Sequence, residues 1–226
     1  GYGTADNNGP NGDYGGERVA LQPGLWELLG RSLLYGIGIF LVIPAPWVAT
    51  SFYRWIATRA QVPGRPNLAF TGQVGDIWWA FVAIGLLTYA GFGGNFLHLL
   101  AFLGQGYLSW MVLRWIASHL SSNGKPLAIT FEGNVLAYIG WHLLLGISFI
   151  SIIGWAWVVT AWMRWNCRNV VGTHREILFT ASGLAVLWRT VLFGFACSFI
   201  LPIPWMLRWY SRWYAAQFEL VERVAA

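Results

Sequence analysis

Ionisable side chains inside apolar segments are the groups of this chain that could do chemistry. Arg31 follows the apolar residue Leu21 by ten positions, and Arg189 follows Phe179 by the same distance. Glu27 precedes Arg31 by four residues, which places both on one face of a helix. Because an ionisable group is costly in an apolar medium, such residues are candidates for a functional site. Two interpretations are open: a local Glu27–Arg31 ion pair, or contact of the arginines with a substrate or a lipid headgroup.

Two histidines, His98 and His142, also lie within apolar runs. An imidazole can ligate haem or a pigment, or it can relay protons. It can equally form a hydrogen bond to a neighbouring helix. A pigment- or haem-binding role through His98 or His142 is therefore one alternative, and packing is the other.

Sequence signatures of catalysis are missing from the chain. It contains no P-loop, no GxSxG, no HExxH and no pair of carboxylates within an apolar run. Cys167 and Cys197 do not form a metal-binding motif. The sequence therefore predicts a protein that is not an enzyme and that has no metal site and no resident cofactor.

The composition of the chain predicts an integral membrane protein. Of 226 residues, 57% are hydrophobic and only 10% are charged, whereas a soluble domain carries about 25% charged residues. A helix crosses the apolar core of a bilayer in about 20 residues. Four runs without Asp, Glu, Lys or Arg approach or exceed that length: 32–53, 77–113, 133–163 and 190–207.

Tryptophan and arginine dominate the flanks of these runs. The chain has 16 Trp, a residue that collects where lipid meets water. The net charge is +5, and 13 of the 14 basic residues are arginine, which suits contact with phosphate or carboxylate groups. The basic residues stand next to apolar runs, so membrane lipids are the expected partners and nucleic acid is excluded.

A pattern of four repeats runs through the chain. Each repeat has an Arg–Trp pair, an aromatic residue seven positions before the arginine and a Pro/Gly break before that aromatic residue. Agreement at several spaced positions is a strong architectural signal. The prediction is a polar Gly/Asn-rich tail over 1–18 and one membrane domain over 19–226, with repeats at about 19–66, 67–125, 126–174 and 175–226.

Each repeat is predicted to hold a short extended piece, an apolar helix, a Pro/Gly break and a Trp–Arg helix. We expect an all-α membrane fold of about five transmembrane helices, within a range of four to six. Two spans belong to the second repeat, which has the longest uncharged run. The alternative is a set of hairpins that enter the membrane only half-way.

The Trp–Arg helices are expected to be amphipathic and to lie at the membrane interface. Their arginines can extend toward lipid phosphates while the rings stay in the apolar layer. The predicted headgroup contacts are Arg54, Trp55, Arg114, Trp115, Arg164, Trp165, Arg208, Arg212 and Trp213.

The repeated unit resembles the YjgN-type family of bacterial inner-membrane proteins over about residues 19–220. The resemblance implies the bacterial inner membrane and a multi-pass architecture, but it implies no activity. The residues that carry it are Phe70-Thr71-Gly72, Pro46-Trp47, Pro204-Trp205, Arg54-Trp55, Arg212-Trp213 and the turn residues Gly64, Gly124 and Gly172.

Four functions fit this sequence. The leading hypothesis is a non-catalytic subunit or scaffold of a larger membrane complex, with a protein partner that orders residues 1–16. A small-solute or lipid transporter or channel is the second and requires Arg31, Arg189, His98 and His142 to converge. Membrane shaping by wedge-like hairpins is the third and requires every Arg–Trp segment on one side. Pigment or haem binding is the fourth.

Overall fold

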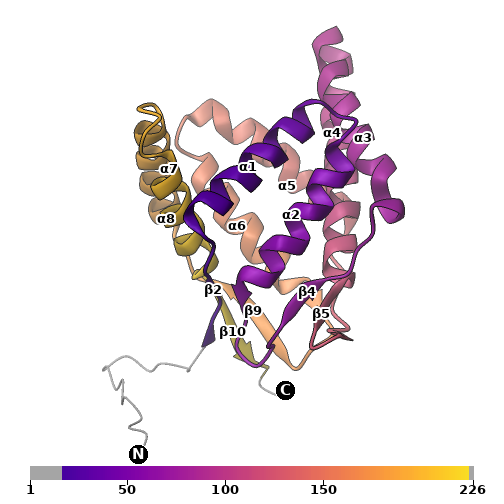
Figure 1. The fold of residues 1–226 in the computed structure, drawn as a ribbon. Coiled ribbons are helices and arrows are strands. Elements are labelled where there is room, and N and C mark those ends of the chain that lie inside the picture. The colour runs from indigo at the N-terminus through magenta and orange to yellow at the C-terminus, as the bar shows by residue number, and fades with distance from the viewer. Residues whose placement is uncertain (1–16, 224–226) are drawn as a thin grey trace, which may run out of the picture.

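A ring of four helical hairpins makes up the molecule (Figure 1). The computed structural model describes residues 17–223. Within them, eight α-helices pair in chain order, and neighbouring hairpins pack α2 on α3, α4 on α5 and α6 on α7. The last helix, α8, packs on α1 and closes the ring. The hairpins are α1 (Leu25–Phe40) with α2 (Ala45–Arg59), α3 (Val74–Ala90) with α4 (Asn95–Ser118), α5 (Val135–Ser148) with α6 (Trp155–Arg168), and α7 (Gly183–Cys197) with α8 (Ile203–Ala215).

Each hairpin stands on its own pair of antiparallel strands, at the lower edge of Figure 1. The strand before the first helix pairs with the strand after the second, so all four hairpins begin and end on one side. The pairs are β2 (Ala20–Leu21) with β3 (Ala60–Gln61), β4 (Leu68–Phe70) with β5 (Leu120–Ser122), β7 (Thr130–Phe131) with β8 (Val170–Val171), and β9 (Arg175–Phe179) with β10 (Phe218–Glu222).

Two further strands complete the layer. β6 (Lys125–Pro126) extends the second pair, and β1 (Glu17–Arg18) pairs with β10. Glu17 lies opposite Leu220 in that register, so the two ends of the described chain meet. Glu17 and Arg18 were expected to belong to the polar tail, but they form a strand. The rest of that tail, residues 1–16, lies outside the described residues, as does the expected partner contact there.

The uncharged runs are divided between the two arms of a hairpin. Pro44, Gly94, Gly154 and Pro202 stand at the turns, where each run reverses direction. Seven of the eight helices described in 17–223 have 13–17 residues, about 20–26 Å at 1.5 Å per residue. Among the helices described in residues 17–223, only α4, with 24 residues, is long and apolar enough to cross a membrane. One such helix stands where about five had been expected from the sequence.

We call the four hairpin turns the tips. Three of them share one backbone conformation. Val42, Ile152 and Ile200 have φ of 67°, 66° and 63°. The residue after each one donates its amide to the carbonyl of the residue before it, at 2.6–2.8 Å. This is a tight turn of three residues, and it is strained for a β-branched side chain. The second hairpin turns at Gly94, and glycine adopts this φ of 123° without strain because it has no side chain.

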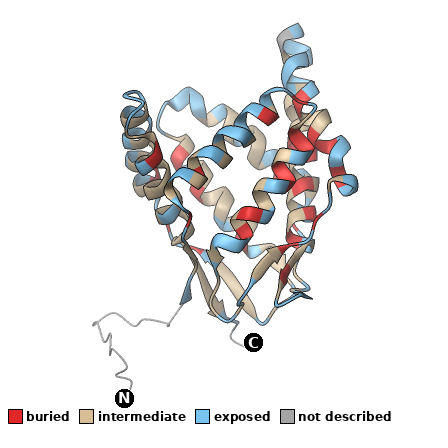
Figure 2. Cartoon of the chain, viewed as in Figure 1, coloured by how far each residue is buried: buried red, intermediate tan, exposed pale blue. Residues whose placement is uncertain are grey.

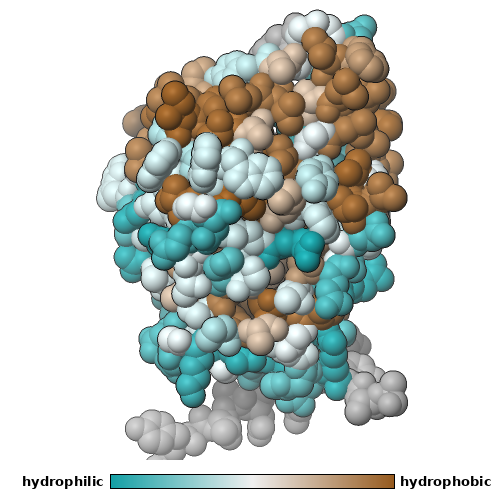
Figure 3. Space-filling model, turned by 90° about the vertical axis from the view of Figure 1, so that its right-hand side faces the viewer, coloured by the Kyte–Doolittle hydropathy of each residue, from teal (hydrophilic) through white to brown (hydrophobic). Residues whose placement is uncertain are grey.

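The molecule is apolar at the tips and polar at the strands. Large aliphatic side chains stand exposed at three tips, with Ile43 at 75%, Ile150 at 82% and Leu201 at 83%. Figure 2 shows the upper ends of the helices as exposed, and Figure 3 shows that the hydrophobic surface gathers over the same half. The hydrophilic surface lies below, over the strands.

Buried residues gather at the seams, which are the contacts between neighbouring hairpins. Phe70 and Trp115 lie in the core of the first seam, Phe131 in that of the second and Phe179 in that of the third. Within the described part of the chain, no such cluster fills the fourth seam, between α8 and α1. Leu21 occupies the strand position there that holds phenylalanine at the other three seams, and it is only half-buried.

Candidate functional site

The four Arg–Trp pairs lie toward the strand-side ends of the return helices, by which we mean the second helix of each hairpin. The sequence predicted separate helices at the membrane interface, but in the structure these helices are hairpin arms that lead from a tip back to a strand. All four pairs therefore stand on the same side of the molecule. They are Arg54-Trp55 in α2, Arg114-Trp115 in α4, Arg164-Trp165 in α6 and Arg212-Trp213 in α8.

Two of these arginines fasten one hairpin to the next. Arg54 donates from Nη2 to the carbonyl oxygen of Gly72 at 2.8 Å. Arg164 donates from Nη2 to the carbonyl oxygen of Ala181 at 2.9 Å. In both cases the acceptor is the second residue after the strand that begins the next hairpin. A charged donor to a backbone carbonyl is a strong hydrogen bond, so these arginines hold the first and third seams together.

Tryptophan takes this place at the second seam. Trp110 donates from its indole nitrogen to the carbonyl oxygen of Gly133 at 2.8 Å, again two residues after a strand. The Arg114 guanidinium lies over the Trp110 ring, 4.7 Å from its centre. At three seams, therefore, the return helix binds the start of the following hairpin.

Glu27 joins the two arms of the first hairpin, so of the two interpretations left open by the sequence, the local Glu27–Arg31 ion pair is wrong. Glu27 accepts the Trp55 indole N–H at 2.6 Å and pairs with Arg59 at 2.7 Å. Arg31 instead donates to the Ser51 hydroxyl at 3.3 Å. The local spacing of four residues loses to contacts from α2, because hairpin closure brings Trp55 and Arg59 over the carboxylate.

Asp76 has the equivalent place in the second hairpin. Its carboxylate accepts the Gln73 amide at 2.8 Å and so caps the start of α3. It also accepts the Trp115 indole N–H at 3.2 Å and lies 3.6 Å from His119 Nε2. The hydrogen bonds from Gln73 and Trp115 and the nearby His119 hold the pKa of this carboxyl below its usual value. This contribution to stability is present above the ordinary Asp pKa and is lost in stronger acid.

Glu27→Ala is expected to lower the free energy of unfolding by about 1 to 2 kcal/mol, since it leaves the indole N–H of the buried Trp55 and the Arg59 guanidinium without their acceptor. Denaturation in a mild detergent, followed by helical circular dichroism, measures this loss. Glu132→Ala is the matched control, because Glu132 is exposed and its carboxylate has no partner among residues 17–223. Equal stability of the two variants would contradict the inter-helix role of Glu27.

Arg31 and Arg189 have matching surroundings in the first and fourth hairpins. Arg189 lies between two indole rings, 4.3 Å from the centre of Trp188 and 4.4 Å from that of Trp213. Arg31 lies 5.6 Å from the Trp55 ring centre. Trp55 and Trp213 are the tryptophans of their Arg–Trp pairs, so in both hairpins an arginine of the first helix contacts the return helix.

The two histidines face different surroundings. His98 hydrogen-bonds near the second tip, 3.3 Å from the carbonyl oxygen of Gly91. His142 stacks on Phe102 with ring centres 4.2 Å apart, and its Nε2 atom is buried with no hydrogen-bond partner in the described residues. The contacts found for Arg31, Arg189, His98 and His142 all go to other residues, so none joins two members of this set.

An apolar cavity of about 270 Å³ lies within the strand layer. Strands and turns of all four hairpins line it, with Val62, Leu120, Val170 and Leu220 among them. Arg175 reaches across this layer from β9 and donates to the carbonyl oxygen of Pro63 at 2.7 Å. The cavity therefore belongs to the shared core of the strand layer.

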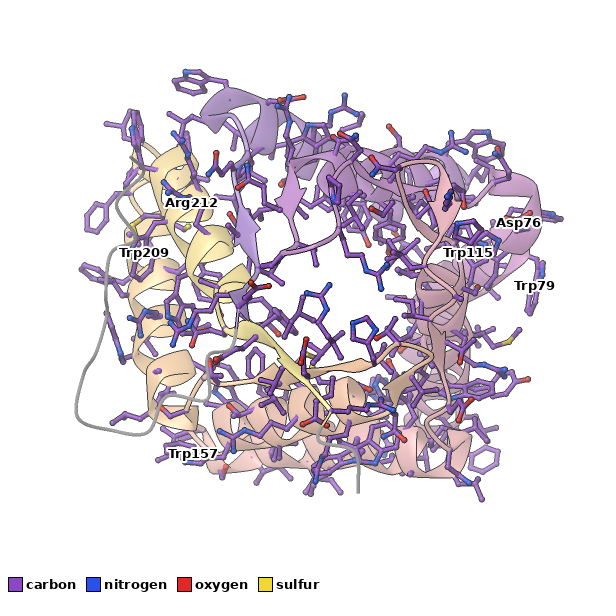
Figure 4. All side chains as sticks on the ribbon, turned by 90° about the horizontal axis from the view of Figure 1, so that it is seen from below. Asp76, Trp79, Trp115, Trp157, Trp209 and Arg212 are labelled. Atoms are coloured by element: carbon purple, nitrogen blue, oxygen red, sulfur yellow. The ribbon has the colours of Figure 1, made fainter. Side chains whose placement is uncertain are left out.

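A larger groove, of about 620 Å³, opens at the fourth seam, between α8 and the strands β1 and β2. Arg18, Arg208 and Arg212 line it together with Trp205, Trp209 and Trp213. Figure 4 shows Trp209 and Arg212 on α8, at the side of the ring where α8 meets the N-terminal strands. The spacing of four residues in α8 points to this set, but it does not predict Arg18, which had been assigned to the tail.

Comparison with protein-family models, with curated proteins and with solved structures finds no match for this chain. The resemblance to the YjgN-type family rests on the short motifs described above. Groups of three or more metal-ligating side chains are also not found among residues 17–223.

Proposed function

We propose that this protein is a non-catalytic membrane-shaping protein whose four hairpins enter one leaflet of the bacterial inner membrane from the same side. The observation that carries the proposal is the separation of surfaces along one axis. Exposed aliphatic side chains crowd the tips, while the strands and the Arg–Trp pairs gather at the opposite end. Membrane shaping requires every Arg–Trp segment on one side, and the gathering of all four pairs at one end of the molecule supports it.

Helix length supports entry into one leaflet. Arms of 13–17 residues are about 20–26 Å long, whereas the apolar core of a bilayer is about 30 Å thick. A hairpin of such arms can bury its tip in lipid and return to the surface that it entered from. The longer α4, which rises above the other helices in Figure 1, reaches further.

The backbone at the tips is suited to an apolar surrounding. In lipid, each polar backbone group must find its partner within the protein. The tight turns at Val42, Ile152 and Ile200 pair their amides with carbonyls of the same tip. Tip hydroxyls are paired as well: Ser148 donates to the carbonyl oxygen of Leu145, and Ser198 to that of Gly194.

Four hairpins in one leaflet act as a wedge. They add cross-sectional area to the leaflet that they enter, while the opposite leaflet gains area only where α4 reaches it. Arginine and tryptophan at the strand-side ends suit the headgroup layer and fix the depth of the wedge.

The scaffold role expected from the sequence depends on residues 1–16, which lie outside the described structure, and it stays a prediction.

Labelling of single cysteines in membranes tests the proposal. With Cys167 and Cys197 replaced by alanine, a cysteine is placed at Gln61, Lys125, His174 or Glu222, one exposed strand-side position for each hairpin. Entry from one side predicts that an impermeant maleimide labels all four from the same face of the membrane. A cysteine at Ile152 is expected to resist labelling from both faces.

The five-span arrangement gives a different pattern. With one, two, one and one spans in the successive repeats, His174 stands on the face opposite to Gln61, Lys125 and Glu222. Labelling of position 174 from that opposite face would overturn the proposal.

Electron microscopy of vesicles with bound protein measures membrane shaping, with smaller or tubular vesicles as the expected result.

A further inference from the structure

At the fourth seam, neighbouring hairpins leave an open groove that reaches the strand side of the ring. At the other seams a phenylalanine of the first strand is buried, while Leu21 in the same place lines the groove. Arg54 and Arg164 bind carbonyl groups of the hairpin that follows them. For Arg212, which has the same position on its return helix, no such hydrogen bond is found within residues 17–223.

The groove concentrates positive charge. Arg18, Arg208 and Arg212 line it, and within the described residues no ion pair joins any of them to a carboxylate. Glu219 lies opposite Arg18 in the strand register but does not line the groove. The Nε atom of Arg208 is buried without a hydrogen-bond partner in that part of the chain. Three guanidinium groups in one groove match the oxygens of a phosphate, which they bind in pairs of hydrogen bonds.

On the α8 side, the groove is also lined by three tryptophans that lead toward the tip. Trp213, Trp209 and Trp205 follow one another at intervals of four along α8, from its strand-side end to its start beside the fourth tip. Trp205 is 56% exposed and meets Trp26 edge-on at 5.9 Å between ring centres. Exposed indoles are typical of the lipid–water interface. A ligand with a phosphate at one end and an apolar chain toward the tips would fill this groove.

We propose that the groove between α8 and the β1–β2 strands binds the phosphate of an anionic glycerophospholipid through Arg18, Arg208 and Arg212. The site rests on the proposed function, because insertion of the tips brings the groove to the headgroup layer. A soluble phosphate ester shares the headgroup chemistry but has no chain to lie along Trp209 and Trp205. The groove therefore selects among the lipids that surround the protein.

The test compares two triple variants. Arg18→Gln/Arg208→Gln/Arg212→Gln removes three charges from the groove. Lys125→Gln/Arg168→Gln/Arg223→Gln removes three charges from exposed positions elsewhere. Binding of each to phosphatidylcholine vesicles is measured with and without phosphatidylglycerol. The preference for phosphatidylglycerol is expected to fall roughly tenfold or more in the groove variant, since one charged hydrogen bond alone is worth about a factor of ten.

The outcomes separate this site from the insertion of the tips. If both triple variants lose the preference equally, the effect is one of net charge and the site is overturned. If binding to pure phosphatidylcholine vesicles is absent in the unaltered protein, the proposed function itself fails. Glycerol phosphate, added to the protein in detergent, tests whether the groove binds a soluble phosphate ester. If it competes for the groove as strongly as a short-chain phosphatidylglycerol does, the assignment to a lipid is overturned. Helical circular dichroism establishes that both variants are folded.

Discussion

Aspartate at three hairpin tips is expected to release the protein from membranes. Ile43, Ile150 and Leu201 are the sites, because each is exposed at its tip and packs little against the fold. Moving an aspartate into the apolar layer costs about 3 kcal/mol more than an aliphatic residue. Each substitution should therefore weaken insertion roughly a hundredfold, and the three together should abolish it. Flotation with phosphatidylcholine vesicles measures the bound fraction without a contribution from lipid charge.

The matched control carries the same three aspartates at the other end of the molecule. Gln61, Thr130 and His174 are exposed on the strand side, so Gln61→Asp/Thr130→Asp/His174→Asp should float as the unaltered protein does. If the tip variant floats equally well, the tips do not enter lipid and the wedge mechanism is wrong. Loss of flotation in both variants would trace the effect to charge or to unfolding.

Removal of the Phe131 ring is expected to give the largest loss of stability among single substitutions in the seams. Phe131 is 2% exposed and packs across the seam in one cluster with Ala117 of α4. Within its own hairpin, its ring centre lies 6.0 Å from that of Trp165 and 6.4 Å from that of Tyr138. Replacing a buried phenylalanine with alanine costs about 3 to 5 kcal/mol, from lost burial and from the cavity left behind. Denaturant unfolding in a mild detergent, followed by helical circular dichroism, gives the change.

Leu21→Ala is the matched substitution at the fourth seam. Leu21 has the same strand position but is half-buried beside the open groove, so its replacement should cost no more than about 2 kcal/mol. Equal losses at Leu21 and Phe131 would mean that the fourth seam is as tightly packed as the second. A small loss at Leu21 would agree with a groove left for another molecule.

Local signals predicted the helical elements well. The breaks that the repeat pattern predicts at Pro44, Gly154 and Pro202 are confirmed, because helices end and begin around them. The break that it predicts in the second repeat, at Gly104 and Gly106, is wrong, since both glycines lie inside α4 and the chain turns at Gly94 instead. The number of spans was misjudged because each uncharged run was counted across its break. A run of sufficient length spans a bilayer only as one straight helix, and a tight turn at Val42 or Ile200 reverses the chain within it.

Contacts between distant segments were beyond the sequence. Glu27 meets Trp55 and Arg59 only after the first hairpin closes, so its spacing from Arg31 was misleading. The groove depends on a still longer connection, since Arg18 and Arg212 come from opposite ends of the chain. Periodicity within one helix carries no information about such pairs. The arginines of the Arg–Trp pairs were identified as candidates, but the fastening of one hairpin to the next by Arg54 and Arg164 was missed.

The pairing of β1 with β10 also determines the order in which the molecule can be assembled. Three seams join consecutive hairpins and can form as the chain leaves the ribosome, because domains and their parts form from the N-terminus during synthesis. The fourth seam must wait until residues up to Glu222 have been made, since Glu17 and Arg18 have no other strand to pair with among those described. Its long loop closure makes it the slowest contact to form. Until then the ring is an open chain of hairpins, and the groove, which α8 forms together with β1 and β2, is incomplete.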